Sequence, residues 1–137
     1  MAYDNLGEGV LEYFPCRYGK SKLTFRGPRR RLDGRYVTVL GGSETYGKFV
    51  ARPYAELTEN MSGTKVVNLG TMNAGIDDYV GDQTVMEACA GAAATVLQIS
   101  GAQNMSNRFY AVHPRRNDRF LRASNLLNTI YREVDFT

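Results

Sequence analysis

Short apolar runs alternate with longer amphipathic stretches along most of the chain. The runs at 36–40, 65–69 and 94–99 are rich in β-branched residues and predict buried strands. Apolar side chains recur at helical spacing over 45–60, 76–90 and 118–132, with breaks expected at Pro53 and Gly81. Three strands that each precede a helix predict an α/β fold with a parallel sheet and right-handed crossovers.

The segment before this pattern has weak periodicity and many glycine and proline residues. Residues 1–35 are therefore expected to form a basic N-terminal arm, and residues 36–137 the α/β domain. Positions 15–35 carry eight basic side chains against Asp33 alone. The block Pro28–Arg31 is of a kind that binds phosphate, nucleic acid or an acidic glycan. No RNA-binding or helix-turn-helix signature accompanies it, so nucleic acid is not expected as a partner.

Length and composition limit the function classes. A chain of 137 residues, 43% of them hydrophobic, is long enough for one domain with a core. No apolar window predicts a transmembrane helix and no signal peptide is visible at the N-terminus, so no membrane association is expected. Cys16 and Cys89 lie far apart and form no CxxC pair, which favours reduced thiols in a cytoplasmic protein. With a single histidine and no Cys/His cluster, neither a metal nor another cofactor is expected.

Each predicted strand ends in a polar loop that contains glycine. Gly41 and Gly42 interrupt the first strand and place Ser43 at its end. The second strand leads into 68–75 and the third into 101–104. Because the carboxyl ends of parallel strands meet at one edge of a sheet, the three loops are expected to share a crevice.

These three loops, in this order, resemble the SGNH (GDSL-like) hydrolase family. The resemblance implies a three-layer α/β/α fold of the flavodoxin-like type and hydrolysis of ester or acyl groups. It assigns the nucleophile to Ser43 and an oxyanion-hole N–H to Gly75, with Gly70 as the alternative. It assigns the oxyanion-hole amide to Gln103 or Asn104. The stretch 36–137 is more narrowly similar to an SGNH-like family of bacterial proteins.

The chain departs from the family pattern in two places. Gly42 stands where the family has aspartate, and the C-terminal Asp-x-x-His segment that activates the serine does not occur. His113 is the only histidine, so it is the one candidate for an imidazole base. The sequence is therefore expected to be the N-terminal portion of an SGNH-like domain, with slow or absent esterase activity.

Other interpretations of the same residues stay open. The pocket can be a non-catalytic binding module for a glycan, a nucleotide or a protein, with Gly42, Arg108 and Arg115 contacting an anionic ligand. Residues 42–48 also fit G-x-x-x-x-G-K, a phosphate-binding loop in which Phe49 replaces the magnesium-binding hydroxyl. Alternatively, the glycines only form tight turns. A sheet of three strands leaves an open edge, so self-association is expected.

Overall fold

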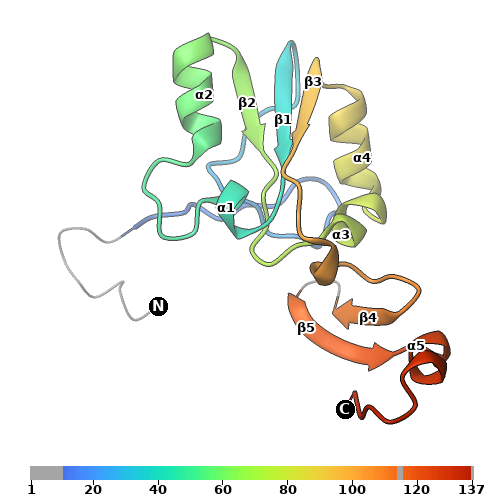
Figure 1. Cartoon of the computed structure of the whole chain (residues 1–137). Coiled ribbons are helices and arrows are strands. Elements are labelled where there is room, and N and C mark those ends of the chain that lie inside the picture. The colour runs from blue at the N-terminus through green and yellow to red at the C-terminus, as the bar shows by residue number, and fades with distance from the viewer. Residues whose placement is uncertain (1–10, 114–115, 137) are drawn as a thin grey trace.

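The computed structural model describes residues 11–113 and 116–136. Strands and helices alternate over most of this range (Figure 1). In chain order the elements are β1 (Tyr36–Leu40), α1 (Ser43–Tyr46), α2 (Tyr54–Ser62), β2 (Lys65–Asn68), α3 (Ile76–Val80), α4 (Gln83–Ala90), β3 (Ala94–Leu97), the 3₁₀ turn η2 (Ala102–Asn104), β4 (Tyr110–His113), β5 (Arg116–Ala123) and α5 (Asn125–Ile130).

The three predicted strands form one parallel sheet, which confirms the α/β prediction. The strand order is β2-β1-β3, with Val39 paired to Asn68 on one side and to Val96 on the other. All three strands point the same way, so their carboxyl ends lie together at one edge (Figure 1). The crevice expected from the sequence is at this edge.

Two core clusters pack against opposite faces of β1, because successive strand residues alternate between faces. Val39 packs with Ala55 of α2 and with Val66. Leu40 belongs to a larger cluster that includes Val85 and Ala88 of α4. The helix α2 therefore covers one face of the sheet, and α4 covers the opposite face.

Residues 11–35 contribute to the same core. Tyr18, Leu23 and Phe25 are buried in the larger cluster, and Cys16 pairs with Phe25 in an isolated antiparallel bridge. The described part of the basic segment is thus packed against the sheet.

Arg26 ties this segment to the loop that follows α1. Its side chain is 5% exposed, and it lies 4.8 Å from the centre of the Tyr13 ring. The guanidinium donates to four carbonyl oxygens at 3.0–3.1 Å, those of Tyr46, Gly47, Val50 and Ala51. A planar fork with five donors suits this task, because each carbonyl meets an N–H in a fixed geometry.

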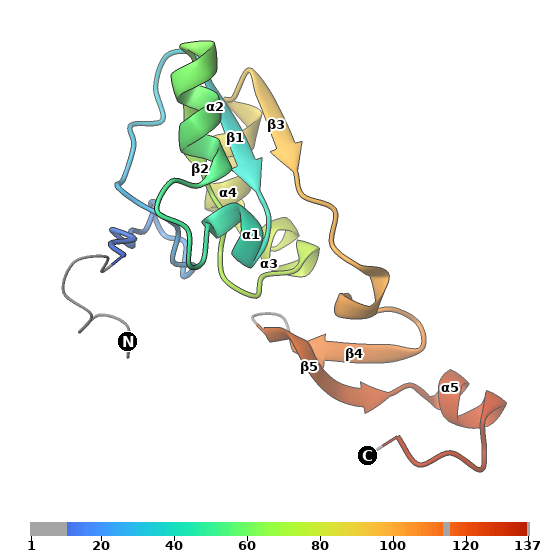
Figure 2. The same ribbon diagram turned by 60° about the vertical axis from the view of Figure 1, so that its left-hand side comes forward.

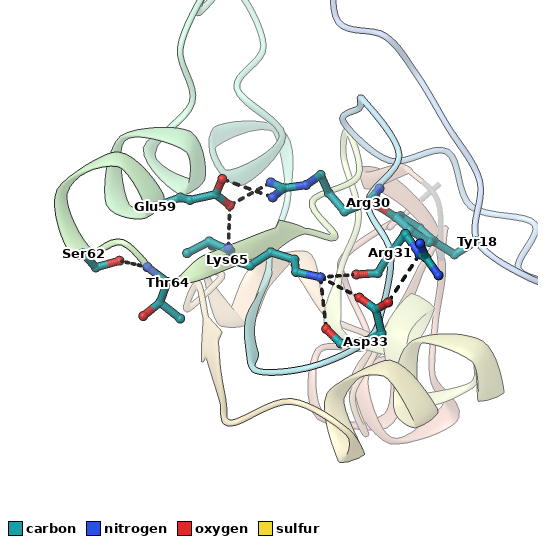
Figure 3. Close-up of polar contacts among 9 residues, drawn as sticks. Tyr18, Arg30, Arg31, Asp33, Glu59, Ser62, Thr64 and Lys65 are labelled. Atoms are coloured by element: carbon teal, nitrogen blue, oxygen red, sulfur yellow. Dashed lines mark hydrogen bonds and ion pairs between the residues drawn. The ribbon is translucent and has the colours of Figure 1, made fainter.

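Two ion pairs fasten the same segment to α2 and β2 (Figure 3). Arg30 makes a bidentate contact with Glu59 at 2.7 and 3.1 Å, and Glu59 also accepts from the Val66 N–H at 2.8 Å. Lys65 Nζ lies 3.0 Å from Asp33 Oδ1. Hydrogen bonds from Arg30 and Lys65 hold the pKa values of Glu59 and Asp33 below their usual values.

The predicted helix over 45–60 is replaced by two helices. α1 ends at Gly47, which adopts a left-handed conformation with φ of 85°. α2 begins after Pro53, whose ring suits a helix start and not its interior. The predicted helix over 76–90 is present as α3 and α4, with the expected break at Gly81.

The predicted helix over 118–132 is wrong for most of its length. Residues 116–123 form β5, which pairs antiparallel with β4. Ser124 then caps the shorter α5 by accepting from the Leu127 N–H at 3.1 Å. Pairing with β4, which is separated from β5 by two residues, outweighs local helical periodicity here. β4, β5 and α5 lie beyond the carboxyl ends of the parallel sheet (Figure 2).

Among the described residues, no helix combines the length and the apolar character needed to cross a membrane.

Candidate active site

Ser43 is the first residue of α1, directly after the turn that ends β1. Gly41 makes this turn possible, because a Cβ there would lie 2.2 Å from Thr45 Oγ1 and 2.4 Å from Gln98 Oε1. Ser43 is half-buried and lines a cavity at the carboxyl edge of the sheet. The strand-to-helix corner predicted from the sequence is present.

Gln98, the first residue after β3, holds this turn in place. Its Oε1 accepts from the Gly42 N–H at 3.1 Å and from the Thr45 hydroxyl at 2.7 Å. Its Nε2 donates to Glu44 Oε2 at 3.0 Å. One side chain thereby connects the end of β3 to the start of α1.

The end of β2 makes a second connection to α1. Asn68 Nδ2 donates to the Thr45 carbonyl at 2.8 Å, and its Oδ1 accepts from the Gly70 N–H at 2.8 Å. A Cβ at Gly70 would lie 2.4 Å from the Tyr46 nitrogen. Gly70 therefore allows close packing of the second loop on α1, which is a structural role.

The second loop reaches the serine through Asn73. The Asn73 N–H donates to Ser43 Oγ at 3.1 Å, and Ser43 Oγ donates to Asn73 Oδ1 at 3.5 Å. Asn73 has φ of 58°, a conformation that asparagine tolerates better than most residues. Gly75, the residue assigned by resemblance, uses its N–H for Asp78 Oδ2 at 3.3 Å. The loop thus presents an asparagine to Ser43, where the resemblance implied a glycine N–H.

The third loop brings one of its two candidate amides to the serine. Asn104, at the end of η2, lines the same cavity as Ser43 and Asn73. The Gln103 side chain is exposed and folds over Gly101, where a Cβ would lie 2.5 Å from the amide. Gln103 is absent from the cavity wall. Of the two candidate amides, Asn104 lines the cavity that holds Ser43 and Gln103 does not.

The cavity has two adjoining chambers. The chamber that holds Ser43, Asn73 and Asn104 measures about 350 Å³ and is mainly polar. The neighbouring chamber measures about 160 Å³, and Gly75 and Ile76 lie in its mainly apolar wall. Five residues line both chambers, namely Gly42, Ala74, Gln98, Ile99 and Ser100. Ser43 therefore lies beside a space for a small apolar group.

Two titratable groups line the chambers, one acidic and one phenolic. The hydrogen bond from Gln98 holds the pKa of Glu44 below its usual value, so this carboxylate is ionised at neutral pH. Burial raises the pKa of Tyr79 to about 12, so its hydroxyl remains protonated and lies 2.5 Å from the Gly41 carbonyl oxygen. Neither group is tuned to act as a base near pH 7.

Two of the remaining candidate residues do not line the cavity that holds Ser43. His113 belongs to β4 and does not line either chamber. Arg108 is exposed, and its guanidinium lies 4.9 Å from the centre of the Phe109 ring. Arg115 falls outside the described residues. In the described part of the chain, no group of three His, Cys, Asp or Glu side chains has the arrangement of a metal site.

The G-x-x-x-x-G-K stretch has the backbone of a helical turn. The Tyr46 N–H donates to the Gly42 carbonyl, and the Gly47 N–H to the Ser43 carbonyl, both at 2.9 Å. Lys48 follows this turn, and its Nζ lies 5.1 Å from the centre of the Phe49 ring. These N–H groups are used within the helix, so the arrangement gives no support to a phosphate cradle.

Sequence reasoning missed Asn73 and Gln98. A signal existed for each, since both are polar and both belong to segments that follow an apolar, β-branched run. Gln98 was assigned to the third strand, which ends one residue earlier at Leu97. The resemblance implies a glycine in this loop and assigns no role to Asn73.

Comparison with known proteins gives a family but no activity. The family described as "Domain of unknown function (DUF6473)" matches residues 1–137. No curated protein and no solved structure matches the chain.

Proposed function

We propose that this chain, which belongs to the DUF6473 family, carries a serine acyl-transfer site of the SGNH type. The observation that carries the proposal is the convergence of Ser43, Asn73 and Asn104 on one cavity. These residues follow three parallel strands in the order β1, β2, β3, as the three loops of SGNH hydrolases do.

The sheet supports the same proposal. The observed order β2-β1-β3 is the first part of the flavodoxin-like order 2-1-3-4-5. Core clusters that pack α2 and α4 against opposite faces of β1 are consistent with a three-layer α/β/α arrangement. In such folds ligands bind outside the carboxyl ends of the strands, where Ser43 lies.

The proposed chemistry is transfer of an acyl group from an ester to Ser43. The serine oxygen attacks the ester carbonyl, the alcohol leaves with the serine proton, and water later releases the acid. The Asn104 amide and the Ser43 N–H stabilise the oxyanion, and Asn73 orients the hydroxyl. An acyl group of about the size of benzene fits the apolar chamber, because apolar cavities of about 150 Å³ hold benzene.

The described residues supply no imidazole at the serine, so we expect slow chemistry. p-Nitrophenyl acetate should add one acetyl group to Ser43, and added imidazole should accelerate this step by acting as the missing base. Intact mass and peptide mapping by mass spectrometry measure the modification. Ser43→Ala should abolish it.

Ser100→Ala is the matched control, because Ser100 lines the same chambers and has the same hydroxyl. This variant should be acetylated at Ser43 at the wild-type rate. Acetylation that survives in Ser43→Ala, or that maps chiefly to Ser100, would refute the assignment of the nucleophile.

A second candidate is a binding pocket that retains the geometry without turnover. The observation in its favour is that the Ser43 hydroxyl is engaged by an asparagine and not by a base. The ionised Glu44 in the wall favours a neutral or cationic ligand over an anionic one. Binding of methyl butyrate in an NMR titration, with no acetylation of Ser43 even with imidazole, would select this candidate.

A further inference from the structure

The two chambers beside Ser43 give the two parts of an ester different surroundings. An acyl group in the mainly apolar chamber of about 160 Å³ leaves the alcohol part in the mainly polar chamber of about 350 Å³. Ser43 belongs to the wall of the polar chamber, and the five residues shared by both walls make the two spaces continuous. The wall of the polar chamber therefore indicates which kind of alcohol the site takes.

Glu44, the residue after Ser43, gives the polar chamber its charge. Among the described residues, it is the one charged side chain in the wall of that chamber, and the wall of the apolar chamber has none. The hydrogen bond from Gln98 keeps the pKa of Glu44 low, so the carboxylate is ionised at neutral pH. A negative wall attracts a cationic alcohol part and repels an anionic one.

Gly42 leaves open the space in front of this carboxylate. A Cβ at Gly42 would lie 3.3 Å from the Ala74 carbonyl oxygen and 3.8 Å from Glu44 Oε2. Gly42 and Ala74 line both chambers, so the carboxylate lies close to the junction between them. Asn73 Oδ1 adds a further oxygen near Ser43 Oγ, at 3.5 Å. Oxygen atoms with full or partial negative charge thus gather where the alcohol part would meet the serine.

The Glu44 carboxylate is held in one direction and can still accept hydrogen bonds. Gln98 Nε2 donates to Glu44 Oε2 at 3.0 Å, while Gln98 Oε1 is bonded to Gly42 and Thr45. A carboxylate has about four acceptor sites, so most of its capacity remains for a ligand. A side chain that is already oriented loses little rotamer freedom when it binds a cation.

We propose that the Ser43 site acts on esters of a short uncharged acid with an amino alcohol, whose ammonium group lies against the Glu44 carboxylate. This inference rests on the proposed acyl transfer and names its substrate class. The ester C–O bond breaks, the acyl group joins Ser43 Oγ, and the amino alcohol leaves with the serine proton. Water then releases the acid.

Binding of two esters of the same shape tests the substrate class without turnover. Acetylcholine carries a quaternary ammonium group, and neohexyl acetate carries an uncharged tert-butyl group in its place. Dissociation constants are measured by NMR titration of the full chain with Ser43→Ala, which cannot be acylated at this position. Because Glu44 is exposed, acetylcholine should bind about fivefold more tightly at low salt, the effect of an exposed ion pair. Added salt should bring the two constants together.

Glu44→Gln, made in the same Ser43→Ala background, removes the charge and keeps an oxygen that can accept from Gln98. In this variant acetylcholine should bind about fivefold more weakly, and neohexyl acetate should bind as before. Glu87→Gln is the matched control, because Glu87 is also exposed and lines neither chamber. It should leave both dissociation constants unchanged.

Equal affinity for the two esters, or a preference for acetylcholine that survives in Glu44→Gln, would overturn the substrate class. A preference that salt does not reduce would overturn it as well, and this measurement does not depend on the folding of Glu44→Gln. Acetylation of Ser43 by the uncharged p-nitrophenyl acetate is measured separately, and its absence would refute the proposed acyl transfer. The two failures are therefore distinguishable.

Discussion

At the scale of single residues, Gln98 and Thr45 decide the geometry of the serine turn. The Thr45 side chain is fully buried, and its hydroxyl lies within hydrogen-bond distance of Gln98 and of Tyr54. The Gly42 N–H also depends on Gln98. The Gln98 amide therefore joins the end of β3 to the turn after β1 and to α1, because it supplies both a donor and an acceptor.

Replacement of Gln98 by alanine should destabilise the fold. The change removes the acceptor of the Gly42 N–H and one of the two partners of the buried Thr45 hydroxyl, and an unsatisfied buried group costs about 1–3 kcal/mol. We expect a loss of about 2 kcal/mol in the free energy of unfolding, measured with urea. Gln83→Ala, which removes an exposed contact with Glu87, should change it by less than about 0.5 kcal/mol. Equal effects would show that the Gln98 network is not needed for stability.

Sequence reasoning located the serine but not the residues around it. Ser43 was predicted because two glycines after a β-branched run mark the end of a strand. The choice between Gln103 and Asn104 stayed open, because adjacent residues differ only in the direction of their side chains. That direction is set by η2, which depends on the local backbone and not on a motif.

At the scale of elements, the N-terminal segment is joined to α2 and β2 through charged side chains. Glu59 receives Arg30 and the Val66 N–H, while Lys65 contacts Asp33 and the carbonyl of Arg31 (Figure 3). Three basic side chains of the segment, those of buried Arg26, Arg30 and Arg31, thus make contacts within the molecule. Arginines that cluster in a sequence can therefore serve to hold one segment against the rest of the fold.

The ion pair at Glu59 should make stability depend on pH. The pKa of Glu59 is lowered in the folded state, chiefly by the hydrogen bond from Arg30, relative to an ordinary value of 4.5. Its contribution is complete above that value and is lost as the pH falls through the lower folded pKa. Urea unfolding at a series of pH values should therefore show that Glu59→Gln destabilises the protein at pH 7.

In acid the same substitution should matter less, because Glu59 itself becomes neutral. Glu56→Gln on the same helix is the control, since Glu56 is exposed and contacts Arg52 at 3.6 Å. A difference between wild type and Glu59→Gln that stays constant from pH 7 to below the ordinary value would contradict this account.

At the scale of the whole molecule, the parallel sheet was predictable and the hairpin was not. The strands at 36–40, 65–68 and 94–97 each contain neighbouring apolar residues, many of them β-branched, which local patterns show well. β5 places Phe120 opposite Val112 and Arg122 opposite Ala111 in an irregular register, which apolar periodicity does not specify. Apolar residues at 120, 121 and 127 fit a helix equally well, so pairing with the preceding strand β4 decides the structure.

The assembly of three loops into one site is the central claim, and the rate of Ser43 acetylation tests it most directly. The rate with p-nitrophenyl acetate and imidazole is compared by mass spectrometry among wild type, Asn104→Ala and Gln103→Ala. If Asn104 holds the oxyanion, its replacement should slow acetylation on the order of 100-fold, and replacement of Gln103 should leave it unchanged. A slow Gln103→Ala with a normal Asn104→Ala, or equal rates in all three proteins, would contradict the proposed site.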